Sequence, residues 1–140
     1  MLEIRPSPSD CVICQIVARK IPSWIVYEDS HTIGFLPLEV EVYGHTIIAP
    51  KTHYADIFEA ATPVLCELTA TAQCLAQHFK KCIGASGVNL LHASGGAAQQ
   101  SVPHLHIHLL PRFDGDGLNA WPQFPSHDYD KDALLQKLKL

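Results

Sequence analysis

Short segments rich in branched and aromatic residues occupy positions 24–28, 32–36 and 45–49. Val, Ile and aromatic side chains favour strands. Asp29-Ser30 separates the first two segments, and a looser connection around Gly44 precedes the third. Strands joined by such short connections usually pair as antiparallel neighbours. The pattern therefore predicts an antiparallel sheet built from consecutive strands.

The clearest helical pattern begins at Thr62, which we expect to cap a helix with Pro63 at its first position. Gly84 is expected to end it. Apolar side chains recur at intervals of three and four residues, at Leu65, Leu68, Ala72, Leu75, Phe79 and Ile83. This spacing places them on one side of the helix, so the helix should lie across one face of the sheet.

A shorter helix is predicted over residues 11–19, with Asp10 as its cap and Pro22 closing it. Its first turn contains Cys11 and Cys14, and a Cys-x-x-Cys pair can hold a metal or act as a redox couple. A redox couple is expected after a strand in a βαβ unit, and no strand-like segment precedes this pair. A metal site is therefore favoured, and two reduced cysteines without a metal are the alternative.

The other three cysteines, Cys66, Cys74 and Cys82, fall within the long helical segment. Each step of eight residues turns about 80° around a helix, so the three do not share a face. We interpret them as small buried apolar residues. The total of five cysteines is odd, which argues against a disulfide framework.

A fourth strand is predicted at residues 88–92, and Ser94-Gly95-Gly96 breaks it. The fifth runs from position 103 until Pro111 ends it, before the loop at 114–117. The tail has few apolar residues besides Trp121, Phe124 and a weakly amphipathic stretch at 129–138. We predict an α+β fold with a five-stranded antiparallel sheet, one long helix and a short N-terminal helix. Residues 1–140 should form a single domain, with a core at about 11–112 and a tail at 113–140.

Three histidines alternate with apolar residues in the fifth strand. Successive side chains of a strand point to opposite faces. One face should therefore carry the imidazoles and the other the apolar side chains of Leu105, Ile107 and Leu109; the imidazoles are those of His104, His106 and His108. A solvent-facing strand that happens to be rich in histidine is disfavoured, because Thr, Ser, Lys or Glu would serve equally on a polar face. The chemical alternatives are a metal site, acid/base catalysis and a nucleophile, and the spacing alone does not rank them.

Length and charge narrow the class of protein. A chain of 140 residues suits one domain. A formal charge of −4 and a pI near 6.1 provide no basic field for a nucleic acid partner. No apolar run approaches the ~20 residues that span a bilayer, and no signal-like segment begins the sequence. We expect a cytoplasmic protein that binds neither nucleic acid nor membrane.

The sequence His-Leu-His-Ile-His-Leu-Leu resembles the signature of the histidine triad (HIT) family. Further matches to Hint-like members are Phe35-Leu36, the segment at 44–51 with His53, and the segment at 100–102. Together they extend over residues 11–112. The chain thus resembles a Hint-like nucleotide hydrolase of the bacterial zinc-containing type.

The resemblance implies a role for each matched residue. His106 would be the nucleophile that attacks an α-phosphorus and forms a nucleotidyl-histidine that water resolves. His108 would contact the phosphate and the leaving group, and His45 would support the nucleophile. Gln100 and Ser101 would contact the phosphate and the bridging atom, with Ser101 in the catalytic set, and the substrate-binding set also includes Phe35 and Leu38. Uridylyltransferase relatives carry Gln in place of the third histidine, so His108 favours hydrolysis of a phosphoramidate or phosphoanhydride. DNA-repair relatives carry a basic zinc-finger segment that this acidic chain lacks.

The resemblance also implies a structural zinc ion bound by Cys11, Cys14, His53 and His104. Two thiolates and two imidazoles suit a closed tetrahedral site. The alternative that the triad itself binds a catalytic metal is weaker, because no carboxylate stands near it in the sequence. Hint-like proteins form homodimers through the long helix and an adjacent strand, so a homodimer is expected, with the contribution of Trp121 open.

Three departures from the family pattern fall on the substrate side. Pro37 replaces the acidic residue that binds ribose hydroxyls, Ala93 an Asn, and Gln99 a Gly. Glu39 or Glu41 could substitute for the lost carboxylate. Two alternatives to an ordinary nucleotide hydrolase therefore stay open. The first is the same chemistry on an atypical or pathway-specific substrate, and the second is a catalytically weak nucleotide-binding regulatory protein.

Overall fold

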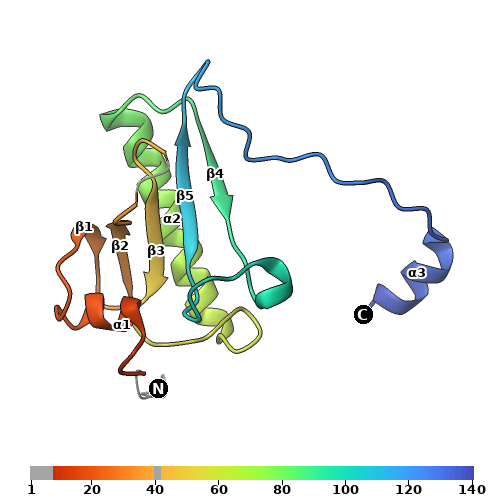
Figure 1. Ribbon diagram of the computed structural model, residues 1–140, viewed down its shortest axis with the longest axis horizontal. Helices are drawn as coiled ribbons and strands as arrows, with labels where there is room; N and C mark the ends of the chain where they lie inside the picture. The colour runs from red at the N-terminus through yellow and green to blue at the C-terminus, as the bar shows by residue number, and fades with distance from the viewer. Residues whose placement is uncertain (1–7, 40–41) are drawn as a thin grey trace.

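Five antiparallel strands form one sheet in the order β1-β2-β3-β5-β4 (Figure 1). The structure is a computed structural model that describes residues 8–39 and 42–140. The strands are β1 (Trp24–Glu28), β2 (Thr32–Leu36), β3 (Thr46–Pro50), β4 (Gly87–Leu91) and β5 (Ile107–Arg112). The first two strands begin and end where the sequence pattern places them, and the third and fourth are displaced by one residue.

Two helices flank the sheet (Figure 1). The long helix α2 (Thr62–Cys82) lies behind the sheet, and the short helix α1 (Val12–Val17) lies in front of it. A single 3₁₀ turn, η1 (Gly96–Ala98), follows β4, and α3 (Lys131–Leu138) closes the chain. Within the described residues, none of these helices is long and apolar enough to cross a membrane.

Each face of the sheet has its own buried cluster. On the α2 face, Leu68, Leu75 and Phe79 pack against Leu105 and Leu109. On the α1 face, buried residues of α1 and its cap pack against one side of β2 and β3. The cluster consists of Cys11, Ile13, Cys14 and Ile16 from the helix and its cap, Ile33 and Phe35 from β2, and Ala49 from β3. Because both faces of β2 are covered, its first four residues are all buried. Burial of this apolar surface supplies most of the driving force for folding.

Both predicted helix caps are wrong. The thiol of Cys11, and not Asp10, caps α1 by accepting a hydrogen bond from the backbone N–H of Cys14 at 3.4 Å. Ala61 occupies the N-cap of α2 without a side-chain hydrogen bond, and Thr62 is already helical. Pro63 does lie in the first turn, where a missing N–H costs nothing.

The burial predicted for the helical cysteines is also wrong, since Cys66, Cys74 and Cys82 are all exposed. The buried positions of α2 are instead Val64, Leu68, Thr71, Ala72, Leu75 and Phe79. The three thiols fall outside this stripe because their positions turn away from the sheet. Their presence on α2 therefore contributes little to the core.

The histidine strand begins later than its alternating pattern predicts. Only His108 lies within β5, and His104 and His106 precede its first residue, Ile107. The alternation of faces nevertheless persists, because Leu105 and Leu109 are buried on the α2 side. Pro111 does not end the strand. It pairs with Val88 of β4 at a position past the end of the β3 ladder, where its missing N–H breaks no bond on that side.

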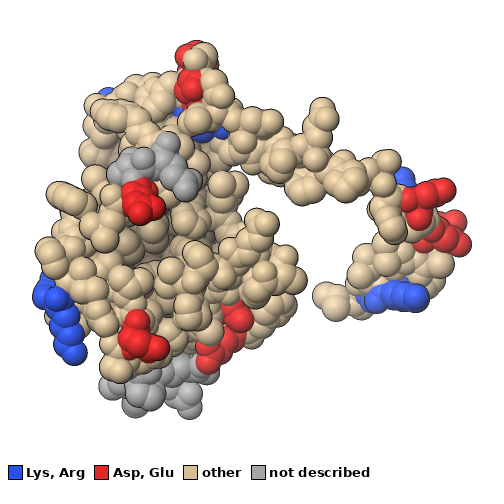
Figure 2. All heavy atoms as spheres, in the orientation of Figure 1, with Lys and Arg blue, Asp and Glu red and all other residues tan. Residues whose placement is uncertain are grey.

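The tail leaves the sheet beyond β5 as an extended segment, and α3 stands apart from the sheet and its flanking helices (Figure 1). No residue of α3 is buried. Trp121 and Phe124 are also exposed. Figure 2 shows that most of the face in view is uncharged, with acidic side chains inside it and toward its lower edge, basic ones at its left edge, and both kinds on α3.

Candidate functional site

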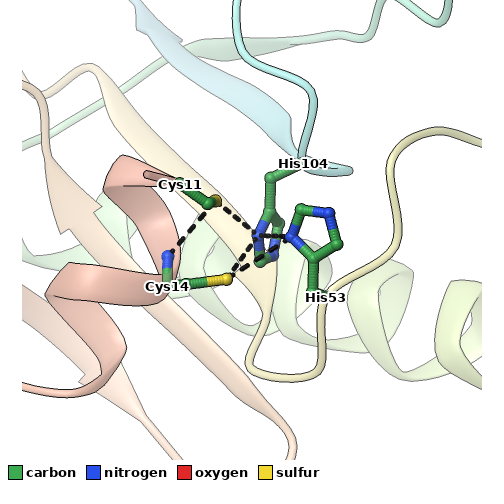
Figure 3. Close-up of side chains that lie close together, drawn as sticks. All are labelled: Cys11, Cys14, His53 and His104. Carbon is green, nitrogen blue, oxygen red and sulfur yellow. Dashed lines mark hydrogen bonds between the residues drawn. The ribbon is translucent and has the colours of Figure 1, made fainter. Parts of the chain in front are cut away.

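Four side chains from three parts of the fold converge beside α1 (Figure 3). Cys11 and Cys14 come from the start of α1, His53 from the loop after β3, and His104 from the segment before β5. Their ligand atoms all lie within 4.8 Å of one another. The Nδ1 atom of His104 lies 3.3 Å from Cys11 Sγ, 3.5 Å from Cys14 Sγ and 3.1 Å from His53 Nδ1. The structure thus brings together all four residues that the resemblance assigned to a metal.

The tautomer of His104 follows from its other ring nitrogen. Nε2 lies 2.8 Å from the carbonyl oxygen of Pro50, which can only accept, so Nε2 carries the proton and Nδ1 offers a lone pair to the cluster. Burial lowers the pKa of His104 to about 4 despite the Pro50 hydrogen bond. The ring is therefore neutral at pH 7, as metal ligation requires.

The spacing of the donors also fits a zinc ion. Zinc bonds of about 2.0–2.3 Å at tetrahedral angles place neighbouring ligand atoms roughly 3.3–3.8 Å apart. Four of the six donor pairs lie 3.1 to 3.5 Å apart, close to that range, and all lie within 4.8 Å. Two thiols and two imidazoles with these separations need little movement to close around a metal.

His106 uses its ring nitrogens in the opposite way. Its Nδ1 donates to the carbonyl oxygen of His104 at 2.6 Å, which leaves Nε2 unprotonated. The residue is 7% exposed, and burial lowers the pKa of its imidazole. A neutral imidazole with a free Nε2 lone pair is suited to nucleophilic attack near neutral pH.

A second imidazole pair adjoins His106. The rings of His106 and His108 have centroids 4.9 Å apart, and His108 Nδ1 lies 2.9 Å from His45 Nε2. The supporting histidine therefore contacts His108 directly. Burial, followed by the neighbouring imidazoles of His106 and His45, lowers the pKa of His108 to about 4. The rings of His45, His108 and His106 form a line of imidazoles that can donate and accept hydrogen bonds at a phosphate.

An apolar cavity of about 160 Å³ opens beside His106. Phe35 and Leu38, both predicted to bind substrate, contribute to its wall together with Pro37. Its other walls come from α1, the segment after α1, β3 and Val102; they include Ile13, Ile16, Ile21 and Ile47. Glu39 is exposed and is not part of this wall, and Glu41 lies outside the described residues. The cavity offers a flat apolar group a place next to His106.

Gln100 and Ser101 have different surroundings. The Gln100 amide is bonded to the backbone: Oε1 accepts from Gly95 N–H, and Nε2 donates to the carbonyls of Ala55 and Val102. Ser101 is exposed and lines a cavity of about 510 Å³ together with Cys11 and His53. In this geometry Gln100 braces the loop before the histidines, and Ser101 is the more accessible of the two.

One histidine that the sequence analysis did not single out contacts the site. His92 follows β4, and its Nδ1 lies 2.8 Å from the carbonyl oxygen of His106. Nothing in the sequence pattern marks it, because the loop that places it beside His106 is irregular. A histidine directly after a strand that neighbours the triad strand is the only available clue.

The comparisons with known proteins agree with this geometry. Residues 18–115 match the model of the HIT domain family. The chain belongs to the HIT family. The matched range contains the three triad histidines and His53, and it begins after Cys11 and Cys14.

Three relatives of this HIT protein are informative. An adenylylsulfatase from Arabidopsis thaliana is 32% identical over 93% of this chain and 66% of its own length. An adenosine 5′-monophosphoramidase from Saccharomyces cerevisiae is 30% identical over 91% of this chain and 78% of its own length. A zinc-bound histidine triad family protein from Mycobacterium smegmatis is 34% identical, with a TM-score of 0.76 over 79% of this chain and 81% of that protein. Hydrolysis at a nucleotide phosphate thus occurs among the relatives of this chain.

Proposed function

We propose that this protein hydrolyses a phosphoramidate or phosphoanhydride bond at the α-phosphate of a nucleoside 5′-phosphate, through a nucleotidyl-His106 intermediate. The observation that carries the proposal is the hydrogen bond from His106 Nδ1 to the His104 carbonyl, because it leaves Nε2 free to attack. The apolar cavity beside His106 provides a place for the base. The phosphoramidase and adenylylsulfatase relatives support the reaction class.

The reaction proceeds in two displacements. The Nε2 lone pair of His106 attacks the α-phosphorus, and the bond to the leaving nitrogen or oxygen breaks with its electron pair. His108 donates a hydrogen bond to the phosphate and the departing group, and His45 holds the His108 ring through the 2.9 Å contact. Water then attacks the phosphorus, and the bond to His106 Nε2 breaks with its electron pair returning to the ring. The proton that the water loses balances the proton that the leaving nitrogen or oxygen takes up. Splitting one difficult displacement into two easier ones is the benefit of covalent catalysis.

A direct test is to trap the intermediate. Wild-type protein is mixed with an adenosine phosphoramidate, quenched at high pH where phosphohistidine survives, and analysed by peptide mass spectrometry. We expect a nucleotidyl adduct on His106 and no adduct or turnover in His106→Ala, with the fold retained in that variant. Equal turnover in His106→Ala would reject the proposal. Binding of a nucleoside monophosphate without turnover of any phosphoramidate or dinucleotide would favour a regulatory nucleotide-binding protein.

The substrate is proposed to be one that is not selected through its ribose hydroxyls. Pro37 lines the cavity beside His106 and has no hydrogen-bonding side chain. A site that bonds a hydroxyl discriminates strongly against its loss, so a site without that partner discriminates weakly. We expect kcat/KM for ribo- and 2′-deoxyribo-phosphoramidates to agree within about threefold. A strong ribose preference would contradict this part of the proposal.

We also propose that the Cys11, Cys14, His53 and His104 cluster holds a structural zinc ion. Its support is the converging donor set and the zinc-bound relative. A cytoplasmic setting suits the proposal, because a thiolate site needs reduced cysteines. Metal analysis of purified protein should give one zinc ion per chain. More than one tightly held ion would instead point to a second metal site at the triad.

A homodimer is proposed to form along α2 and β4. The edge strand β4 exposes Val88 and Leu90, which line an apolar groove of about 740 Å³ with Leu65, Cys66 and Ala76 of α2. Light scattering should give twice the chain mass, and Leu90→Arg should shift the protein toward the monomer, because it buries a charge at the interface. A monomeric wild-type protein would contradict the proposal.

A further inference from the structure

We infer that His92 is a positioning residue for His106 and acts through the backbone carbonyl of that histidine. The inference begins with the end of the β4–β5 ladder. The last paired residues are Leu91 of β4 and His108 of β5, after which β4 gives way to the loop that contains η1. His106 lies two residues before the last pairing, so no backbone N–H of β4 is paired with its carbonyl. The imidazole of His92 provides that missing donor at 2.8 Å.

The direction of this hydrogen bond is fixed by a chain of partners. The His106 carbonyl only accepts, so His92 Nδ1 carries the proton and the Nε2 of a neutral ring accepts. Nε2 lies 2.6 Å from the Ser94 hydroxyl, which therefore donates to it. The Ser94 oxygen in turn accepts from the backbone N–H of Ile57 at 2.9 Å. Every donor in the series Ile57, Ser94, His92 and His106 has an acceptor, so the imidazole of His92 has one favoured orientation.

This series of hydrogen bonds anchors a segment that has little other backbone support. His106 precedes β5, and its neighbour Leu105 is tied to the Tyr54 carbonyl by a 2.7 Å bond from its N–H. The His106 imidazole is fixed to the His104 carbonyl through Nδ1. The hydrogen bond from His92 fixes the next peptide group, so both the ring and the backbone that carries it are held. A displacement of about 1 Å at a reacting group costs roughly 100-fold in rate.

His92 lies on the side of the sheet away from the substrate cavity. It lines a small cavity on the α2 face with Leu105, Ile107, Leu65, Leu68 and Ile57. The apolar cavity beside His106 does not include it. Loss of the His92 hydrogen bond should therefore impair the chemical step and leave binding of the nucleotide unchanged.

The test uses a matched pair of variants. Asn places an amide N–H where His92 carries Nδ1, so His92→Asn keeps the donor to His106. Gln extends the amide toward the position of Nε2, so His92→Gln loses that donor while retaining polarity and size. We expect His92→Asn to keep kcat within about threefold, and His92→Gln to lower kcat by about 10- to 100-fold at unchanged KM. His78→Gln is the control, because His78 is an exposed histidine of α2 away from the site.

Equal kcat values for His92→Asn and His92→Gln would overturn the inference, and so would a loss of kcat that follows a loss of thermal stability in both variants. The inference rests on the proposed function, so a second measurement is independent of turnover. In protein labelled with ¹⁵N-histidine, His106 should give one Nδ1–H tautomer in the wild type and in His92→Asn, and a mixture in His92→Gln. A single tautomer in all three proteins would reject the role of His92. Absence of wild-type turnover with the expected spectra would reject the proposed function alone.

Discussion

Two histidines separated by one residue leave opposite ring nitrogens free of the backbone in this protein. His104 is fully buried and His106 is 7% exposed, and burial lowers the pKa of both. Each also bonds one ring nitrogen to a backbone carbonyl. His104 does so through Nε2, which leaves Nδ1 for the cysteines and His53. His106 does so through Nδ1, which leaves Nε2 for a substrate.

The difference between the two clusters is therefore a difference of tautomer. Residue type, burial and the sign of the pKa shift are the same at both positions, and they do not distinguish a ligand from a nucleophile. The carbonyl that each ring meets does distinguish them, because an oxygen that only accepts must face the protonated nitrogen. Pairs of variants can separate the two roles.

The largest effect should come from His106, the proposed nucleophile. His106→Asn keeps an amide that can donate to the His104 carbonyl but lacks a nucleophilic nitrogen. We expect kcat to fall at least about 1,000-fold, with zinc content and melting temperature close to those of the wild type. Turnover measured with a phosphoramidate, beside metal analysis and calorimetry, checks this. Loss of zinc together with activity in this variant would show that the two clusters do not act independently.

The second variant alters the proposed metal cluster and leaves the triad intact. His53→Ala removes one ligand without touching the segment of the triad. We expect loss of bound zinc and a fall in melting temperature of about 10 °C, because a structural metal stabilises only the folded state. The kcat per folded molecule should fall less than tenfold. His31→Ala, which alters an exposed histidine elsewhere, is the control for both readouts. A loss of turnover as large as that of His106→Asn would show that the metal takes part in the chemistry.

Acid should destabilise the metal-free protein in two steps. The folded-state pKa values of His104 and His108 are about 4, below the ordinary 6.5. The unfolded chain therefore takes up protons first, and the free energy of unfolding falls as the pH drops from about 6.5 to 4.

The second acid step belongs to the carboxylates whose pKa is lowered in the folded chain, Glu28 and Asp116 among them. Asp29 is a partly buried example. Burial alone would raise its pKa, but hydrogen bonds from Thr32, His31 and Tyr27 hold it at about 2, below the ordinary 3.8. Stability from Asp29 is present above pH 3.8 and is lost toward pH 2. Denaturant titrations of EDTA-treated protein should show both steps, and His108→Gln should weaken only the first. A flat profile from pH 7 to 4 would contradict the first assignment.

The smallest effect is expected in the loop that precedes both histidines. Gln99 has a φ of 66°, a conformation that favours Gly. Gln99→Gly should stabilise the fold by up to about 1 kcal/mol and leave the contrast between the two clusters unchanged. Arg19, with a φ of 59°, offers Arg19→Gly as a matched comparison outside the site. Calorimetry checks both, and destabilisation by Gln99→Gly would show that its side chain makes a needed contact.

Much of the fold and the membership of the metal cluster could be predicted from local patterns and the family resemblance. Branched residues and turn signals placed β1 and β2, and the spacing of Leu68, Leu75 and Phe79 placed the buried side of α2. The helix caps could not be predicted from the sequence. Asp10 and Thr62 satisfy the local rule for N-cap residues, but Cys11 and Ala61 occupy the N-cap positions in the folded chain. The predicted start of β5 was also wrong, because an alternating pattern does not show where a partner strand ends.

The sequence by itself determined the antiparallel sheet, the long helix, the alternation of the three histidines and the family to which they belong. These properties depend on short-range periodicity and on residue identity. Only the tertiary structure decided which nitrogen of His104 is free, and which residue reaches the His106 carbonyl. Those outcomes depend on the carbonyl of Pro50 and the imidazole of His92, which come from separate segments and meet the histidines only when the sheet has formed.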